Sequence, residues 1–280
     1  MAMQTEKEWM ERILQVAQQD ERVRAVGLNG SRVNPELKPD CFSDFDVAYL
    51  VTDVGAFTAD HSWVDVFGKR LILQTPNLMV GAKPREDGWF PYLMLFTDGV
   101  RVDLTLVPVS GAQAYLAADS LTKILLDKDG LFPNPPEPDE SSHYIQPPTF
   151  AQFDSSCNEF WWVAPYVMKG LLRGELMYAT WYINHVLRDE LLKMYAWKVG
   201  TESDFSVNLG SAYRFLPTYM TEREYERLLC TYRMESPTAC MQAFNQCCGL
   251  FRLASHAVAL CMDFPYPDYD EKVSSYLRGL

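Results

Sequence analysis

The sequence is poor in positive charge. Its 280 residues include 25 Lys and Arg against 37 Asp and Glu, which gives a net charge of -12. A surface this acidic repels phosphate backbones, so nucleic acid is disfavoured as a partner. The same surface attracts a cationic small molecule, and the charge therefore favours a positively charged ligand.

Features of exported, membrane and disulfide-rich proteins are also missing. No apolar run approaches the roughly 20 residues that span a bilayer, and the first residues lack the basic and apolar regions of a secretory signal. The seven cysteines form no C-x-x-C pair, and the four histidines stand far apart. A disulfide framework and a zinc site are therefore disfavoured. We expect a cytoplasmic protein with reduced thiols and no membrane partner.

The overall composition is that of a folded globular protein, with 48% hydrophobic and 22% charged residues. At about 150 residues per domain, the length suits one large domain or two modest ones. Six prolines lie among polar residues between positions 133 and 148, and such a stretch continues neither a helix nor a central strand. We therefore predict one domain at 1–132, a Pro-rich linker at 133–150 and a second domain at 151–280.

Hydrophobic periodicity differs between the two predicted domains. Apolar residues at helical spacing around 9–17 predict one helix, and short apolar or alternating runs predict strands at 23–28, 45–51, 70–74, 92–97 and 100–107. The turn Asp98-Gly99 joins the last two strands as a hairpin. After the linker, helical spacing predicts helices at 153–172, 177–197, 222–232 and 238–262. The expected fold class is α+β: an N-terminal domain with a mixed sheet, followed by an α-helical bundle.

Two of the predicted helices begin with recognisable capping residues. Thr221 and Glu224 form a capping box, and Ser236 precedes a proline at the first helical position. A cleft between a sheet domain and a helical domain is a usual place for a ligand.

The polar motif with the clearest chemistry begins where the first strand is predicted to end. Gly30-Ser31 can offer backbone N–H groups and a hydroxyl to a phosphate, and Arg32 can neutralise its charge. Asp44 and Asp46 follow at the start of the next strand. Residues two apart on a strand point to the same face, with Cα atoms about 6.8 Å apart. Two such carboxylates without a cation would be costly to bury, so the pair favours a hard divalent metal such as Mg²⁺.

A third carboxylate, Asp103, falls within the last predicted strand, whose other face is apolar. Metal-assisted displacement at phosphorus needs ligands for two ions roughly 3.5–4 Å apart and a group that accepts the proton of an attacking hydroxyl. Three strand-borne aspartates suit that task. The alternative is that Asp44 and Asp46 lie on the solvated face of an edge strand and that Asp103 shares an exposed hairpin face with Arg101 and Thr105. The coincidence of all three aspartates with the Gly-Ser turn favours the metal site.

In this order, Gly-Ser followed by Asp-x-Asp and a later strand carboxylate resembles the nucleotidyltransferases of the DNA polymerase β type. The longer series of motifs resembles the aminoglycoside 6-adenylyltransferases, which modify streptomycin, and it covers nearly the whole chain. The series consists of Asn29-Gly30-Ser31-Arg32, Ser43-Asp44-Phe45-Asp46-Val47, Phe67-Gly68-Lys69-Arg70 with Ile72-Leu73-Gln74, Tyr92-Leu93-Met94-Leu95-Phe96, Val102-Asp103-Leu104-Thr105-Leu106, Phe160-Trp161-Trp162-Val163, Tyr166-Val167-Met168-Lys169-Gly170-Leu171 and Tyr266-Pro267-Asp268-Tyr269.

The resemblance implies a nucleotidyltransferase domain followed by a helical domain that closes on the nucleotide and substrate. It implies transfer of AMP from ATP to a hydroxyl of an aminoglycoside, with the 6-hydroxyl of streptomycin as the favoured acceptor, in a bacterial resistance enzyme. The metal ligands would be Asp44, Asp46 and Asp103, holding two Mg²⁺ ions, with Asp103 also the general base. The nucleotide phosphates would be held by Gly30, Ser31, Arg32 and Lys169.

One segment departs from the family pattern. Where relatives carry Gly-Lys followed by another basic residue, this chain has Gly210-Ser211-Ala212-Tyr213-Arg214, so Arg214 is the residue that keeps a charge for the nucleotide. For a cationic acceptor, Glu159 and Glu175 are candidate bidentate partners of guanidinium groups. Trp161 and Trp162 cannot both face the same side of a helix. We expect one to pack in the bundle and Trp162 to line the substrate site, in a protein that works as a monomer.

Two other functions are compatible with the same residues. The acceptor could be a different aminoglycoside, a lincosamide or a protein side chain, because a hydroxyl acceptor needs only a base and a pocket. The chain could also be a catalytically silent nucleotide-binding sensor, although three intact aspartates speak against it.

Overall fold

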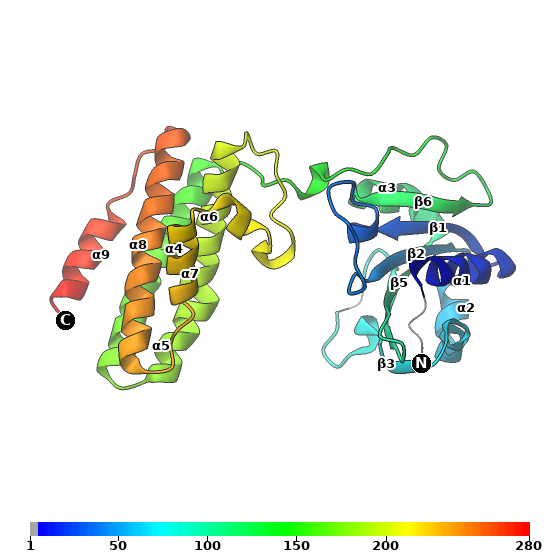
Figure 1. The fold of residues 1–280 in the computed structure, drawn as a ribbon, viewed down its shortest axis with the longest axis horizontal. Coiled ribbons are helices and arrows are strands. Elements are labelled where there is room, and N and C mark those ends of the chain that lie inside the picture. Colours follow the sequence, from blue (N-terminus) through cyan, green and yellow to red (C-terminus); the bar gives the residue numbers. More distant parts are fainter. Residues whose placement is uncertain (1–4, 84) are drawn as a thin grey trace. The chain divides into compact units, whose positions relative to one another are not determined.

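The structure is a computed structural model that describes residues 5–83 and 85–280. The chain divides into two compact units, Met1–Ser142 and His143–Leu280, and the division falls inside the Pro-rich stretch at 133–150. The first unit carries the sheet and the second is helical (Figure 1). Together they form an α+β protein, and the fold class expected from the sequence is confirmed.

A six-stranded mixed sheet forms the centre of the first unit, in the strand order β3-β4-β5-β2-β1-β6. β2 and β5 run parallel, while the other neighbouring strands pair antiparallel. The strands are β1 (Val23–Asn29), β2 (Phe45–Val51), β3 (Arg70–Gln74), β4 (Phe90–Phe96), β5 (Arg101–Pro108) and β6 (Thr122–Asp127). The parallel pair β2 and β5 brings together two segments that lie more than fifty residues apart in the chain.

The two faces of this sheet are covered unequally. One face packs against α1 (Glu6–Gln19), whose Trp9, Ile13 and Ala17 are buried in the main core of the unit. The other face packs against the short helix α3 (Ala112–Ala118), mainly through Tyr115. Because α3 is only 7 residues long, it covers part of that face. Polar side chains on the uncovered part remain open to a ligand.

Five of the six strands agree with the sequence prediction to within two residues at either end. β6 was not predicted, since its residues Thr122–Asp127 adjoin the Pro-rich stretch and alternate only weakly. One detail of the predicted Asp-x-Asp strand is wrong, because β2 begins at Phe45 and Asp44 lies just before it. Asp44 is therefore placed by the preceding loop rather than by the sheet.

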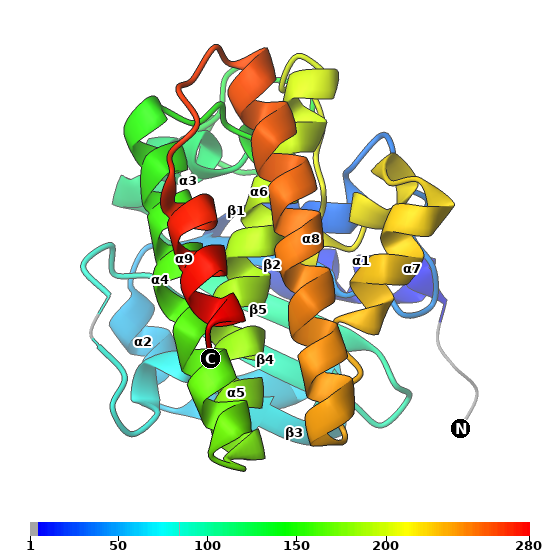
Figure 2. The same ribbon diagram turned by 90° about the vertical axis from the view of Figure 1, so that its left-hand side faces the viewer.

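The second unit is a bundle of long helices, and Figure 2 shows the three longest runs, α4, α6 and α8, side by side. Its helices are α4 (Phe150–Leu172), α5 (Leu176–Tyr182), α6 (Arg188–Glu202), α7 (Glu222–Cys230), α8 (Pro237–Cys261) and α9 (Tyr269–Arg278). The predicted helix at 177–197 is divided between α5 and α6 by a π-helical turn at Ile183–Leu187. α9, which packs on α4, was not predicted. No helix among the described residues combines the length and apolar character needed to cross a membrane.

Aromatic side chains fill the centre of the bundle. The rings of Phe160 on α4 and Phe251 on α8 stack with centroids 3.9 Å apart. Trp161 is 1% exposed and packs edge-on against both of them, whereas Trp162 is 65% exposed. The expectation that only one of the two tryptophans packs in the bundle is confirmed, and the residue left outside is Trp162.

The capping box predicted for α7 is present. The Thr221 hydroxyl accepts the Glu224 N–H at 3.2 Å, and the Glu224 carboxylate accepts the Thr221 N–H at 3.1 Å. We expect Thr221→Ala to lower the free energy of unfolding by about 1 kcal/mol, because the Glu224 N–H in the first turn loses the hydroxyl that accepts it. Chemical denaturation measures the loss. Thr58→Ala, which removes a hydroxyl from an exposed helix end, is the control and should change stability by less than about 0.5 kcal/mol.

Candidate active site

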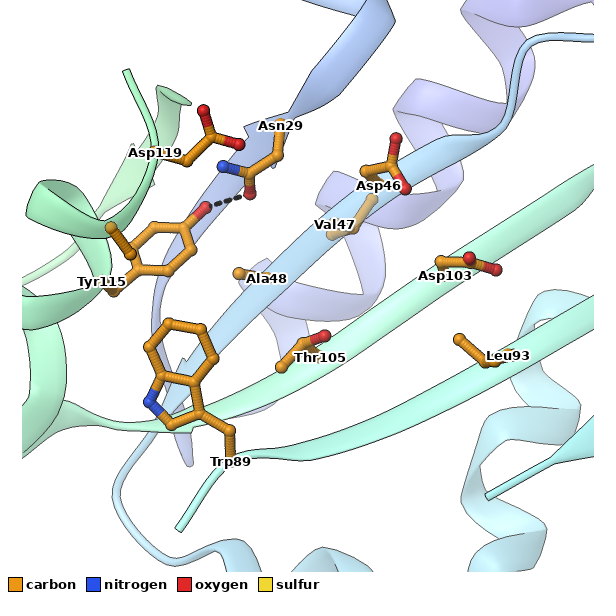
Figure 3. A pocket seen from close by; sticks show the side chains of 11 residues that line it. Asn29, Asp46, Val47, Ala48, Trp89, Leu93, Asp103, Thr105, Tyr115 and Asp119 are labelled. Atoms are coloured by element: carbon orange, nitrogen blue, oxygen red, sulfur yellow. Dashed lines mark hydrogen bonds between the residues drawn. The ribbon is translucent and has the colours of Figure 1, made fainter. Parts of the chain in front are cut away.

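Asp46 and Asp103 lie directly opposite each other on neighbouring strands. They are register partners in the parallel pair of β2 and β5, and both face the side of the sheet that α3 only partly covers. Figure 3 shows them at one end of a cavity, with Thr105 further along β5. Asp44 is the residue just before β2 begins and lies on the same side as Asp46. The sheet therefore brings Asp46 and Asp103 together, and the loop before β2 adds Asp44, the third aspartate that the sequence singled out.

Burial makes it unfavourable for the three carboxylates to be charged at the same time. Burial, followed by repulsion from Asp103 and Asp44, raises the pKa of Asp46 to about 6. The pKa of Asp44 is also raised, first by burial, although Arg101 acts in the opposite direction. Negative charge held in this way favours a cation between the strands.

Arg101 supplies that positive charge in the structure. Its guanidinium donates two hydrogen bonds to Asp103, from Nε to Oδ1 at 2.8 Å and from Nη2 to Oδ2 at 2.6 Å. The same Nε lies 3.5 Å from Asp44 Oδ2. Arg101 is two residues before Asp103 on β5, so both side chains point to one face of the strand. The guanidinium thus touches two of the three aspartates.

The turn after β1 approaches this group closely. Gly30 has φ +72°, and a Cβ added to it would lie 2.6 Å from Asp46 Oδ2. Only glycine combines that backbone conformation with the close approach. The Gly30 N–H is already bonded to the Leu121 carbonyl at 3.1 Å. Ser31 is therefore the residue of this turn with a hydroxyl to offer a phosphate.

Arg32 is tied to the loop that carries Asp44. Its Nε donates to the Asp44 carbonyl at 2.9 Å and its Nη2 to the Ser43 carbonyl at 2.6 Å. Nη1 lies 3.0 Å from Glu6 Oε1, and the guanidinium stacks 3.7 Å above the Phe45 ring. The Arg32 side chain is 5% exposed. These contacts hold the backbone of Asp44 in place.

A cavity of about 330 Å³ extends from Asp46 and Asp103 along the uncovered face of the sheet. At its other end Tyr115 donates a hydrogen bond to Asn29 Oδ1 at 2.6 Å, and the Trp89 ring packs edge-on against Tyr115 (Figure 3). The Tyr115 hydroxyl can lie so close to β1 because residue 27 is glycine, where an added Cβ would be 2.0 Å from it. Asp119 lies at the same end as these rings, so the cavity has carboxylates at both ends and aromatic rings at one, which suits a ligand with polar groups and a flat apolar part.

The remaining candidate residues belong to the helical unit. Lys169 lies in the last turn of α4 and is half-buried, and among the described residues its ammonium group has no carboxylate partner. Arg214 is exposed, with its guanidinium 4.6 Å from the centre of the Phe215 ring. Glu175 is an exposed residue at the start of α5.

Glu159 lines a second cavity, of about 640 Å³, within the helical unit. Beside it Glu190 is already paired, because it accepts hydrogen bonds from Ser156 at 2.6 Å and from Lys193 at 2.6 Å. Glu159 is exposed and forms no ion pair with any residue that the structure describes. It is thus a carboxylate at a cavity wall that is available to a ligand.

Comparison with known proteins identifies the family. The sequence matches the family described as streptomycin adenylyltransferase over residues 3–280. The chain belongs to the streptomycin adenylyltransferase family. The aminoglycoside 6-adenylyltransferase of Campylobacter jejuni is 45% identical over 98% of this chain and 95% of its own. That of Bacillus subtilis strain 168 is 40% identical over 99% and 98%. The crystal structure of a Bacillus subtilis aminoglycoside 6-adenyltransferase is 36% identical, covers 99% of this chain and 98% of its own, and has a TM-score of 0.49.

Membership of the streptomycin adenylyltransferase family confirms the enzyme class inferred from the motifs, a nucleotidyltransferase. The adenylyltransferase family implies a nucleotide as co-substrate. The cavity at Asp46 and Asp103 lies next to the predicted phosphate turn, in the unit that carries the nucleotidyltransferase motifs.

The sequence predicts that these aspartates bind Mg²⁺, so the fit of the donor set matters. The three aspartates offer only oxygen, the ligand type that Mg²⁺ prefers. Burial and mutual repulsion destabilise the charged carboxylates, and a nearby cation offsets this. Arg101 provides part of that stabilisation. Within residues 5–83 and 85–280, no three His, Cys, Asp or Glu side chains lie close enough to coordinate one ion as they stand. The donor chemistry fits Mg²⁺ once the Arg101 guanidinium withdraws from Asp103.

Sequence analysis missed three features of this site. Arg101 appeared only as a neighbour of Asp103 on an exposed face, although its position two residues away already placed it on the same side of β5. Asn29 was noted within a motif but given no role. Trp89 and Tyr115 carried no signal, because only the folding of α3 onto the sheet brings them beside Asn29.

Proposed function

We propose that the protein transfers AMP from ATP to a hydroxyl of an aminoglycoside, with the 6-hydroxyl of streptomycin as the acceptor. The observation that carries the proposal is the register pairing of Asp46 with Asp103 beside the Gly30 turn. In the reaction the acceptor oxygen bonds to the α-phosphorus, the bond to the bridging oxygen breaks, and pyrophosphate leaves. The acidic net charge of -12 favours a polycationic acceptor.

The three aspartates are assigned two roles at the α-phosphate, metal binding and proton acceptance. Asp44, Asp46 and Asp103 would hold Mg²⁺, as two ions, through carboxylate oxygens. Mg²⁺ bound there would supply Lewis-acid polarisation of the phosphoryl oxygens and neutralise charge on the leaving group. Asp103 accepts the proton of the attacking hydroxyl, because it lies opposite Asp46, its side chain is 20% exposed, and its carboxylate becomes available once Arg101 withdraws.

Three side chains are assigned to the phosphates of ATP. Ser31 presents its hydroxyl at the glycine turn, next to Asp46. Lys169 and Arg214 are the basic residues of the helical unit assigned to the triphosphate, and the absence of a carboxylate beside the Lys169 ammonium leaves it available. Arg32 contributes by fixing the loop that carries Asp44.

The acceptor would bind along the exposed face of α4. Ser155, Glu159 and Trp162 follow one another at helical spacing, so they form one stripe on that helix. An unpaired carboxylate beside an exposed aromatic ring suits a guanidinium-bearing sugar. Glu175 is assigned as a second contact, but it lies beyond the end of α4, whose last residue is already about 20 Å along the helix axis from Glu159. It would meet a different part of the acceptor.

The proposed function is tested by pyrophosphate release from Mg²⁺ and ATP, with streptomycin, with other aminoglycosides, with a lincosamide and without an acceptor. We expect release only with streptomycin, and a mass increase of streptomycin equal to one AMP. Release with another acceptor alone would replace streptomycin by that compound. No release with any acceptor would contradict the transferase and favour a nucleotide-binding sensor.

We expect Glu159→Gln to raise the KM for the aminoglycoside about tenfold while leaving kcat within about twofold, because it removes one charge-assisted contact to the bound cation. Steady-state kinetics with the acceptor varied measure the change. Glu226→Gln, on an exposed position of α7, removes one negative charge in the same way and is the matched control. Equal KM values for the two variants would remove Glu159 from the acceptor site, and Glu175→Gln tests the second contact in the same way.

A further inference from the structure

Among the residues that the structure describes, Arg101 is the one cation in direct contact with the cluster of carboxylates formed by Asp44, Asp46 and Asp103. It binds Asp103 through both nitrogens of its guanidinium fork and also lies 3.5 Å from Asp44. Its side chain is 46% exposed, while those of Asp44 and Asp103 are 36% and 20% exposed. The guanidinium therefore reaches the aspartates from the solvent side, from which a metal ion would also enter.

The two oxygens of Asp103 are both occupied by this contact. A bidentate guanidinium occupies one lone pair on each oxygen and places a positive charge beside them, so it opposes both the binding of a metal ion and the transfer of a proton to the same oxygens. Because β5 holds Arg101 and Asp103 two residues apart, the contact forms without any movement of the backbone. Occupation of the site by the metal requires the guanidinium to swing out toward solvent.

We propose that Arg101 is an internal competitor of the metal: it occupies the cation position of the nucleotide-free enzyme and keeps affinity for free divalent cations low. The inference rests on the proposed metal-binding role of Asp44, Asp46 and Asp103. Its consequence is an order of events. Asp103 becomes free to bind metal and to accept a proton only after Arg101 has been displaced, so the catalytic carboxylates are assembled when the metal-nucleotide complex arrives.

The chain contains a matched control for this arrangement. Arg22 also forms a two-pronged pair with an aspartate two residues away, from Nε to Asp20 Oδ1 at 3.0 Å and from Nη2 to Oδ2 at 2.6 Å. Its side chain is 45% exposed, nearly the same as that of Arg101. Arg22 does not touch the three aspartates, so Arg22→Gln removes an equivalent ion pair without affecting the proposed site.

The experiment measures Mn²⁺ binding to the full chain without nucleotide, by calorimetry and by the loss of the free-ion electron paramagnetic resonance signal. We expect Arg101→Gln to lower the Kd for Mn²⁺ about tenfold relative to the wild type, in keeping with the loss of one two-pronged, partly exposed pair. Arg101→Lys, which keeps the charge but loses the fork, should fall between them. Arg22→Gln should bind as the wild type does.

Asp46→Asn separates the failure of this inference from the failure of the proposed function. If Asp46→Asn abolishes Mn²⁺ binding while Arg101→Gln binds as weakly as the wild type or more weakly, the aspartates hold metal and the competitor role is wrong. If Asp46→Asn binds Mn²⁺ as the wild type does, the aspartates are not the metal site and both proposals fall. Circular dichroism spectra of the variants show whether each remains folded.

Discussion

Asp46→Asn is expected to lower the rate of AMP transfer by more than about a thousandfold while making the metal-free protein more stable. The loss of activity follows from the removal of a charged ligand at the reacting phosphate, where charge stabilisation is worth the most. The gain in stability follows from the position of Asp46, buried against Asp103 and Asp44 at the junction of two strands. Asp46 thus lowers the stability of the metal-free fold and is necessary for the reaction.

The raised pKa of Asp46 determines at which pH the charged carboxylate destabilises the folded protein. The pKa of Asp46 is raised from 3.8 to about 6 in the folded protein, so the unfolded chain loses its proton first as the pH rises. The free energy of unfolding therefore falls between pH 4 and pH 6, and the penalty is complete above pH 6. At 1.36 kcal/mol per pKa unit it is on the order of 3 kcal/mol. Below pH 4 the carboxyl is protonated in both states and the penalty is absent.

Denaturation of the wild type and Asp46→Asn, with a metal chelator present, measures this difference at pH 4, 6 and 8. We expect the variant to be more stable by about 1–3 kcal/mol at pH 8 and by nearly nothing at pH 4. Added Mg²⁺ and ATP should stabilise the wild type alone, because a ligand that binds only the folded state shifts the equilibrium toward it. Wild-type activity in the variant would contradict the metal assignment, and equal stability at pH 8 would contradict the burial argument.

Arg32→Met is expected to lower the free energy of unfolding by about 3 kcal/mol and to reduce kcat/KM at least tenfold. The guanidinium of Arg32 is buried, donates to the carbonyls of Ser43 and Asp44, and pairs with Glu6. Removing it leaves two partly buried carbonyl groups and the Phe45 ring without their partner. Asp44 lies outside the sheet, so its carboxylate depends on this contact for its position.

Two further variants show what Arg32 does. Arg32→Lys keeps the charge but cannot bridge two carbonyls, so we expect nearly the same losses of stability and activity as in Arg32→Met. Glu6→Gln removes only the partner at the exposed end and should cost less than about 1 kcal/mol. If Arg32→Lys retained full stability and most of the activity, Arg32 would act mainly as a charge toward the phosphates rather than by holding the loop.

The sequence determined the elements of this protein because local patterns were strong. Alternation placed β2 and β5, the turn Asp98-Gly99 fixed the hairpin between β4 and β5, and capping residues marked the starts of α7 and α8. The order of Gly30-Ser31, Asp44, Asp46 and Asp103 was enough to indicate a nucleotidyltransferase. These signals are readable from the chain because they depend on residues close in sequence, or on the chemistry that a set of residue types requires.

Only the tertiary structure decided which of these residues interact with one another. The parallel pairing of β2 with β5 sets Asp46 opposite Asp103, a register that no local pattern specifies. Arg32 looked like a phosphate ligand, but the fold of the loop turns its guanidinium onto the Asp44 backbone. Arg101 looked like an ordinary exposed residue until its contact with Asp103 was seen. Competition among nearby charges depends on distances and burial, and those exist only after distant segments have been packed together.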